Sequence, residues 1–270
     1  MTEFSVLLSL YAKESPAYLE LALDSIYASS LLPTEVIVVK DGPLTNELEQ
    51  VLKKYQAIKY VPLTTNHGLS YALNKGLEAC KCNLIARMDT DDICHKDRFK
   101  KQIDYFDSHP DVDVVGTYAY KIDETGDTIG LLKVPSTHDE IFSKVWTCPF
   151  IHPTVMFRKD SILRIGGYNP DAGPRQDDYD LWFRCAWNGF KFANIPEPLF
   201  YYRFFSDSIR KNNIKVGWYR FKVGCKGCRK LHFPFWTYIG VFVPFFRSLL
   251  PYPLNVYFNK FMEKINPRNN

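Results

Sequence analysis

The sequence lacks the features that mark several classes of protein. No repeat recurs along its 270 residues, and no Gly/Ser-rich linker divides them. The start of the chain has neither a basic stretch nor a long apolar one, so we expect no signal peptide. Apolar residues make up 46% and charged residues 24%, close to globular norms. These features exclude disordered, collagenous and low-complexity chains and favour one large globular domain or two small ones.

A disulfide framework is also missing. The seven cysteines are odd in number and irregular in spacing, and a chain of this length buries a sufficient core without crosslinks. We therefore expect reduced thiols in a cytoplasmic protein. Cys225-x-x-Cys228 with His232 resembles half of a zinc site, but no second ligand pair follows at standard spacing. Free thiols are the expectation there too.

Long hydrophobic runs are absent as well. Residues 233–246 form an uncharged run of fourteen residues that two prolines interrupt. A membrane-spanning helix needs roughly 20 apolar residues, so we expect no transmembrane helix.

Charge is divided unevenly along the chain. Residues 1–207 carry 22 Lys and Arg against 29 Asp and Glu, whereas residues 208–270 carry 12 basic residues and one acidic residue. The composition predicts two parts, an acidic body over 1–207 and a basic tail over 208–270. A basic tail indicates contact with a polyanion.

The tail has the composition of a segment that lies on an anionic membrane. Its basic side chains alternate with Trp218, Tyr219 and Phe221, and the apolar run 233–246 and a second run at 249–254 follow. We expect a basic, hydrophobic, membrane-associating helical tail. The alternative is a solvated basic helix followed by an apolar packing segment. No nucleic-acid partner is expected, because no recognised binding motif accompanies the charge.

The body alternates between apolar runs of strand length and helical patterns. Strands are expected at 4–10, 35–40, 57–61, 83–88 and 153–158, and helices at 15–29, 45–54, 69–80, 96–108, 137–147 and 177–188. Residues 124–127 predict a hairpin turn. This alternation predicts an α/β fold with a Rossmann-like, doubly wound and largely parallel sheet.

Polar residues follow three of the expected strands, at 9–14, 41–42 and 89–92. Ligands of open α/β sheets bind beyond the carboxyl ends of the strands, so these groups are expected in one crevice. The dinucleotide motif G-x-G-x-x-G is missing from the first two strand ends, and the P-loop pattern is missing too.

Two acidic clusters are the candidates for chemistry. Asp89, Asp91 and Asp92 repel one another unless a cation shares them or water solvates them, and their oxygens suit Mg²⁺ or Mn²⁺. The alternative is an acidic turn before the next helix. Asp177 and Asp178 open an expected helix, where acidic residues are ordinary, and either one could act as a general base.

Nine stretches, in order over about residues 1–205, resemble glycosyltransferase family 2 enzymes of the GT-A fold. The resemblance is to the type that assembles bacterial O-antigen, capsule or exopolysaccharide repeat units. The stretches are SLYAKE (9–14), VIVVKDG (36–42), NHGLSYALNKGL (66–77), ARMDTDD (86–92), RFKKQIDYF (98–106), HPTVMFR (152–158), GGY (166–168), QDDYDLW (176–182) and YYR (201–203).

The resemblance implies a role for each matching residue. Asp41 would accept a hydrogen bond from a uracil ring, which favours a UDP-sugar donor. The implied nucleotide-sugar contacts are Tyr11, Glu14, Asp41, Asn66, Gly68, Arg87 and Asp89. Asp91, with Asp89, would hold Mn²⁺ or Mg²⁺ on the diphosphate. Asp178 would be the general base and Asp177 the less favoured candidate, while His152 and Trp182 are candidates for acceptor contacts.

The implied reaction is a single inverting displacement. A sugar would pass from its nucleotide to a polyprenyl-diphosphate-linked saccharide and form a β-glycoside. The enzyme would then work at the cytoplasmic face of the inner membrane as a peripheral protein. One departure concerns the metal: many relatives have a His two residues after the YR pair, whereas Phe204 and Phe205 follow Arg203 here.

Two other functions remain open from the residues alone. Asp89-x-Asp91 resembles the nucleophile motif of haloacid dehalogenase-type phosphatases, although there the motif normally follows the first core strand. The other alternative is a non-catalytic module that binds nucleotide sugars or docks on a membrane.

Overall fold

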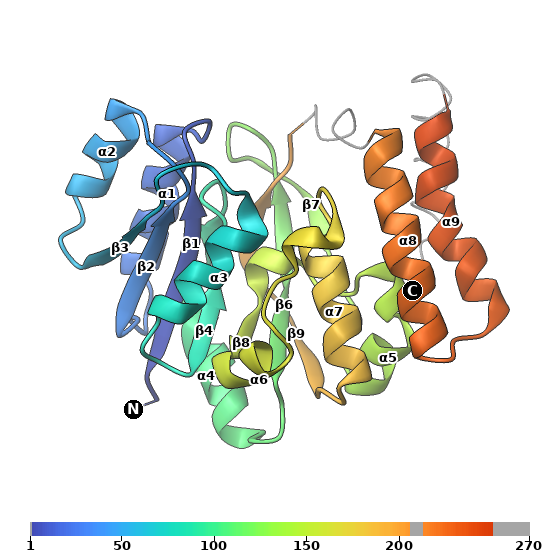
Figure 1. Ribbon diagram of the computed structural model, residues 1–270. Coiled ribbons are helices and arrows are strands. Elements are labelled where there is room, and N and C mark those ends of the chain that lie inside the picture. Colours follow the sequence, from blue (N-terminus) through green and yellow to red (C-terminus); the bar gives the residue numbers. More distant parts are fainter. Residues whose placement is uncertain (1, 206–212, 251–270) are drawn as a thin grey trace.

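The computed structural model describes residues 2–205 and 213–250, and nine strands form one sheet there (Figure 1). The strand order is β3-β2-β1-β4-β8-β6-β9-β5, with β7 paired to β6. The strands are β1 (Phe4–Leu10), β2 (Glu35–Lys40), β3 (Ile58–Pro62), β4 (Leu84–Arg87), β5 (Ile93–Cys94), β6 (Val114–Ile122), β7 (Thr128–Leu132), β8 (Met156–Arg158) and β9 (Phe192–Arg203).

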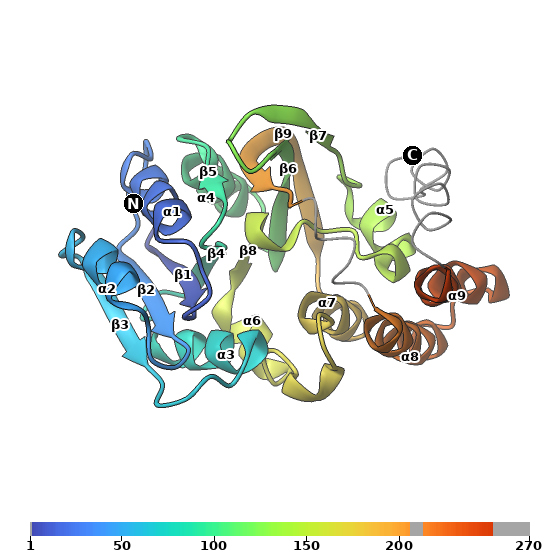
Figure 2. The same cartoon turned by 90° about the horizontal axis from the view of Figure 1, so that it is seen from above.

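Helices flank the sheet on both faces. They are α1 (Pro16–Tyr27), α2 (Asn46–Lys53), α3 (Leu69–Ala79), α4 (Arg98–Ser108), α5 (His138–Ser143), α6 (Lys159–Arg164), α7 (Asp177–Trp187), α8 (Ile214–Lys230) and α9 (Phe235–Leu249). Seen from above, α1, α2 and α4 lie on one face, and α3, α6 and α7 on the other (Figure 2). The doubly wound arrangement expected from the sequence is confirmed.

The first half of the sheet is parallel, as expected. β1 pairs in parallel with β2 on one side and β4 on the other, and β2 pairs in parallel with β3. Successive side chains of a strand point to opposite faces. Val6 and Leu8 accordingly belong to the core under α1, α2 and α4, whereas Leu7 belongs to the core under α3 and α7.

The second half of the sheet is mixed, so the expectation of a largely parallel sheet is wrong there. β8 runs antiparallel to both β4 and β6, while β6 and β9 pair in parallel. The hairpin between β6 and β7 is antiparallel, with its turn at the expected residues. In that turn the Asp123 carboxylate accepts three main-chain N–H groups, and Gly126 has φ +100°.

β9 was not expected from the sequence, because Pro196 and Pro198 interrupt its apolar pattern. The pairing of β6 with β9 shifts register between Thr117 and Tyr118, opposite this Pro-containing stretch. The strand therefore continues past both prolines and brings its end, Arg203, to the edge of the sheet where the polar loops lie.

The tail helices pack on the body and on each other (Figure 1). A Cβ at Gly227 of α8 would lie 2.3 Å from the Phe183 ring on α7, so this glycine permits close approach of the two helices. Cys228 and Val241 are buried in the same core as α7. No helix of residues 2–205 or 213–250 is long and apolar enough to cross a membrane.

Part of the expected tail cannot be compared with the structure. The predicted boundary between residues 207 and 208, the basic residues Arg210 and Lys211, and the apolar run at 249–254 beyond Leu250 lie outside the described residues.

Candidate active site

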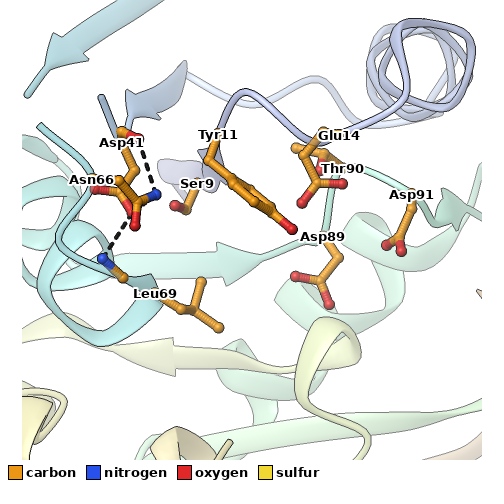
Figure 3. A pocket seen from close by; sticks show the side chains of 10 residues that line it. Ser9, Tyr11, Glu14, Asp41, Asn66, Leu69, Asp89, Thr90 and Asp91 are labelled. Carbon is orange, nitrogen blue, oxygen red and sulfur yellow. Dashed lines mark hydrogen bonds between the residues drawn. The ribbon is translucent and has the colours of Figure 1, made fainter. Parts of the chain in front are cut away.

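A pocket opens at the edge of the sheet where β1, β2 and β4 end (Figure 3). Its lining comes from these three strand ends and from the turn before α3, as the sequence predicted. The lining residues are Ser9, Tyr11, Glu14, Asp41, Asn66, Gly68, Leu69, Asp89, Thr90 and Asp91. Of the expected nucleotide-sugar contacts, only Arg87 is not part of this lining.

Asp41 fixes the turn that leads into α3. Its carboxylate is 4% exposed and accepts hydrogen bonds from Asn66 Nδ2 at 2.9 Å, His67 N at 2.7 Å and Gly68 N at 2.9 Å. Gly68 has φ +88°, a conformation that side chains disfavour. Asp41 therefore both faces the pocket and determines the shape of one pocket wall.

Tyr11 covers the pocket between Asp41 and the acidic loop (Figure 3). Burial raises the pKa of its phenol, and the Glu14 and Asp91 carboxylates raise it further. The phenol therefore stays protonated at neutral pH. It offers the pocket a flat ring and a hydroxyl donor.

The acidic loop brings three carboxylates together. Oxygens of Asp89, Asp91 and Asp92 all lie within 4.8 Å of one another. Burial, and then the charge of Asp89, raises the pKa of Asp91 to about 6, and burial raises that of Asp92. Asp92 is buried and Asp91 is half-buried, so water does not fully solvate the cluster. Clustered and partly desolvated carboxylates favour a bound cation, which lowers their mutual repulsion.

Arg87 holds the acidic loop from below. The arginine is buried at the end of β4 and forms an ion pair with Asp89. Its positive charge also acts on Asp91, Asp92 and Asp177. The resemblance implied that Arg87 contacts the nucleotide sugar; the structure shows its contact with the acidic loop.

Arg203 holds the same loop from the far side. Its main-chain N–H donates to Asp92 Oδ1 at 2.7 Å, and its Nε donates to the Asp91 carbonyl at 2.8 Å. Its Nη1 donates to the carbonyls of Asp123 and Glu124. In the sequence, the YYR stretch matched the family and lacked the histidine that often follows it, but Arg203 was given no role. Its arginine is nevertheless a main support of the loop.

A second buried arginine that the sequence did not single out supports the strands beneath. Arg98 Nη2 donates to the carbonyls of Arg87 and Val155, and Arg98 Nε donates to Gln102 Oε1. The spacing R-x-x-x-Q places both side chains on one face of α4. The sequence signal that could have revealed this support was the polar pair on an otherwise apolar helix face.

Asp177 and Asp178 begin α7, which starts at the same edge of the sheet as α3 (Figure 1). Ser70 Oγ, one residue beyond the pocket-lining Leu69, donates a hydrogen bond to Asp177. Burial raises the pKa of Asp177. Asp178 accepts from Tyr179 N at 2.7 Å and from the Cys148 thiol at 3.3 Å. Neither candidate base lines the pocket, but Ser70 links Asp177 to the pocket wall, and Asp178 is the next residue.

Trp182, a candidate for acceptor contact, lies in the core rather than at the surface. Its side chain is fully buried and packs against Phe150 and His152, because its position on α7 faces the core. His152 is packed as well, with Nε2 2.9 Å from the Tyr168 hydroxyl. Burial lowers the pKa of His152, and Arg87 lowers it further, so the imidazole is neutral.

The residues present fit a divalent cation. Asp91 and Asp89 supply hard carboxylate oxygens at the mouth of the pocket, the ligands that Mn²⁺ and Mg²⁺ prefer. Within residues 2–205 and 213–250, this is the one group of three or more potential ligands close enough to share an ion. The Cys225-x-x-Cys228 pair lies on α8 apart from such a group.

Comparison with known families and proteins shows which proteins this chain resembles. The family model described as Glycosyl transferase family 2 matches residues 5–166. The amylovoran biosynthesis glycosyltransferase AmsE of Erwinia amylovora is 41% identical over 234 residues, which cover 83% of this chain and 86% of the relative. A UDP-Gal:alpha-D-GlcNAc-diphosphoundecaprenol beta-1,3-galactosyltransferase of Escherichia coli is 36% identical and covers 77% of each chain.

A solved structure shares the fold. The mannosyltransferase PcManGT of Pyrobaculum calidifontis, in complex with GDP-Man and Mn²⁺, superposes with a TM-score of 0.65 at 16% identity. The match covers 97% of this chain and 80% of that one. The expected GT-A-like architecture is confirmed, and neither the phosphatase nor the binding-module alternative gains support. Together, the matched family model, these relatives and the acidic pocket at the sheet edge show that the chain belongs to glycosyltransferase family 2.

Proposed function

We propose that the protein is an inverting glycosyltransferase that moves a sugar from a nucleotide sugar, with UDP as the favoured nucleotide, to a lipid-diphosphate-linked saccharide. The observation that carries this proposal is the pocket itself, which places the Asp41 turn at one end and the three-carboxylate loop at the other. These ends are suited to a nucleobase and a diphosphate, respectively.

The donor is proposed to lie across the pocket from Asp41 to Asp91. The Tyr11 ring provides a flat surface for the base, and Asp41 has oxygen lone pairs left to accept a ring N–H. Arg87 holds Asp89 in place through their ion pair. Asp91 and Asp89 would hold a divalent cation, which when bound would neutralise negative charge on the departing diphosphate.

Asp178 is proposed as the general base for the acceptor hydroxyl. Ser70 donates a hydrogen bond to Asp177, and burial raises the pKa of that carboxyl. Asp177 is therefore engaged by α3, whereas Asp178 accepts hydrogen bonds from Tyr179 N and the Cys148 thiol and from no group of α3. Removal of the hydroxyl proton by Asp178 lets that oxygen attack the anomeric carbon in one displacement, so an α-linked donor yields a β-glycoside.

The acceptor class is proposed from the relatives. One of them is named for galactosyl transfer to a GlcNAc-diphosphoundecaprenol, and another for amylovoran biosynthesis. We extend this to an acceptor on a polyprenyl diphosphate in the assembly of a bacterial surface polysaccharide such as O-antigen or capsule. The reacting hydroxyl would then lie near lipid headgroups.

The tail is proposed to hold the enzyme on an anionic membrane surface from the cytoplasmic side. One face of α9 exposes a stripe of apolar side chains at helical spacing: Phe235, Ile239, Phe242, Phe246 and Leu249, with Trp236 beside them. The described tail carries basic residues such as Lys215, Lys226 and Arg229 and no acidic one. Apolar burial and attraction to anionic lipid together give stable interfacial binding.

The catalytic proposal is tested by a donor screen. Purified protein, Mn²⁺ and a synthetic lipid-diphosphate-GlcNAc acceptor are incubated with each nucleotide sugar, and free nucleotide and product are measured. We expect one UDP-sugar to be turned over and the product to have an inverted anomeric centre. A retained configuration contradicts the single displacement. Asp178→Asn should bind donor yet lose transfer, and an active Asp178→Asn beside an inactive Asp177→Asn would exchange their roles.

The membrane proposal is tested by flotation with vesicles of phosphatidylglycerol and phosphatidylcholine. Phe235→Ser with Ile239→Ser should release most of the protein, because two exposed apolar contacts are lost. Leu32→Ser with Ile129→Ser is the control, since these apolar residues are also at least half exposed but lie outside the tail. High salt should release only part of the wild-type protein from the vesicles, because salt screens the electrostatic attraction but not the apolar contacts. Equal flotation of both pairs rejects the stripe as the membrane contact.

A further inference from the structure

Cys148 has a backbone conformation that side chains rarely adopt. It follows the 3₁₀ turn Val145–Thr147 and lies in the left-handed region, with φ +64° and ψ +72°. Few residues other than glycine and asparagine are found there, and such a conformation is unfavourable unless its surroundings hold it. Strained residues of this kind gather at functional sites.

The surroundings of Cys148 lead directly to the proposed base. Its thiol is buried and donates a hydrogen bond to Asp178 Oδ2 at 3.3 Å. The other oxygen, Oδ1, accepts the Tyr179 N–H at 2.7 Å. Each oxygen of the Asp178 carboxylate therefore accepts one hydrogen bond, one from a main-chain donor and one from a side-chain donor. Together these bonds fix the orientation of the carboxylate.

A second hydrogen bond links the segment before Cys148 to α7. Tyr179 Oη donates to the Trp146 carbonyl at 2.7 Å, two residues before Cys148. The Tyr179 ring is fully buried and lies 4.2 Å from the guanidinium of Arg220 on α8. Two hydrogen bonds thus join the segment 146–148 to the start of α7 at residues 178–179. The left-handed conformation of Cys148 directs its thiol toward α7.

We propose that Cys148 is a positioning residue for Asp178. Its thiol orients the carboxylate toward the acceptor hydroxyl, and the observed left-handed backbone brings the sulfur within hydrogen-bond distance of Asp178. Cys148 itself touches no substrate. The proposal rests on the proposed function, in which Asp178 is the base.

The experiment separates the thiol from the backbone. Cys148→Gly removes the donor but suits φ +64°, so the fold should persist. We expect kcat to fall about tenfold with the donor KM unchanged, because the base loses its orientation. Cys148→Asn also tolerates the left-handed region and presents an amide donor. It should restore kcat to within about threefold. Cys225→Ala, a half-buried thiol on α8, is the control and should leave kcat unchanged.

A double-mutant cycle completes the test. In the Asp178→Asn background, Cys148→Gly should reduce the residual rate no further, because the group that it positions is gone. Wild-type kcat in Cys148→Gly, or equal losses in both backgrounds, overturns the positioning role while Asp178 remains the base. Full turnover by Asp178→Asn instead rejects the base assignment, and this inference with it.

Discussion

The Arg203 guanidinium, at the end of β9, donates a hydrogen bond to the main-chain carbonyl of Asp91, which lies 112 residues earlier in the chain. Because the same side chain also bonds to the carbonyls of Asp123 and Glu124, it joins the acidic loop to the β6–β7 hairpin. The Tyr18 ring on α1 lies 4.2 Å from this guanidinium. The position of the proposed metal ligand thus depends on three separate parts of the fold.

Arg203→Lys should weaken Mn²⁺ binding about tenfold, because one ammonium group cannot reproduce the planar set of bonds that orients the loop. Isothermal titration of the free protein with Mn²⁺ measures this without any turnover. Arg158→Lys is the control: Arg158 also bonds main-chain carbonyls, those of Pro110 and Val112, but away from the pocket. Equal Mn²⁺ affinity in all three proteins would show that Arg203 does not position the loop.

Asp91→Asn should abolish Mn²⁺ binding and lower transfer at least about a hundredfold, because a neutral amide replaces the principal anionic ligand. Excess chelator should have the same effect on the wild type, and added Mn²⁺ should restore it. The fold should persist, since the change removes repulsion among Asp89, Asp91 and Asp92. Full wild-type activity in excess chelator contradicts a metal requirement.

Asp41→Asn should raise the donor KM roughly tenfold and change kcat little, because the proposed contact to the base is the same in the ground state and the transition state. Asp41 also accepts three donors from the 66–68 turn, so the substitution should lower the free energy of unfolding by about 1–3 kcal/mol. Steady-state kinetics and urea unfolding measure the two effects. A large loss of kcat at saturating donor with an unchanged KM would reject the assignment.

His152→Gln should make the protein less sensitive to acid. Burial holds the pKa of His152 below its ordinary value, so the unfolded chain binds this proton more readily than the folded one. Stability from this group is present above about pH 6.5 and is lost as pH falls, by at most about 1.4 kcal/mol per pH unit. A glutamine still accepts from the Tyr168 hydroxyl, whose pKa burial raises.

The measurement for His152 is the difference between the two proteins in urea unfolding at about pH 7 and pH 5. A difference is required because the raised pKa values of Asp91 and Asp92 act in the opposite sense on both proteins. The difference in free energy of unfolding between the wild type and His152→Gln should narrow or reverse at pH 5. If this difference in free energy of unfolding does not vary with pH, protonation of His152 does not destabilise the folded protein.

Elements with a strong local pattern were predictable from the sequence. β1 and β2 have the predicted bounds, and α1 begins at Pro16, directly after Ser15, whose side chain accepts the Tyr18 N–H. These patterns act over a few residues: alternating burial defines a strand, and a side-chain cap defines a helix start. The meeting of Asp41 with Asp89 and Asp91 was also predictable, because the carboxyl ends of parallel strands share one edge of the sheet.

Other features depend on contacts that no local pattern records. The direction of β8 and the course of β9 past two prolines follow from pairing with β6. The burial of Trp182 follows from which side of α7 meets the core. Residue types suggest which groups can do chemistry, so the acidic clusters were visible in the sequence. Their supports, Arg203 for Asp91 and Cys148 for Asp178, were decided by the tertiary structure, because each contact joins segments that only the packed sheet brings within hydrogen-bond distance.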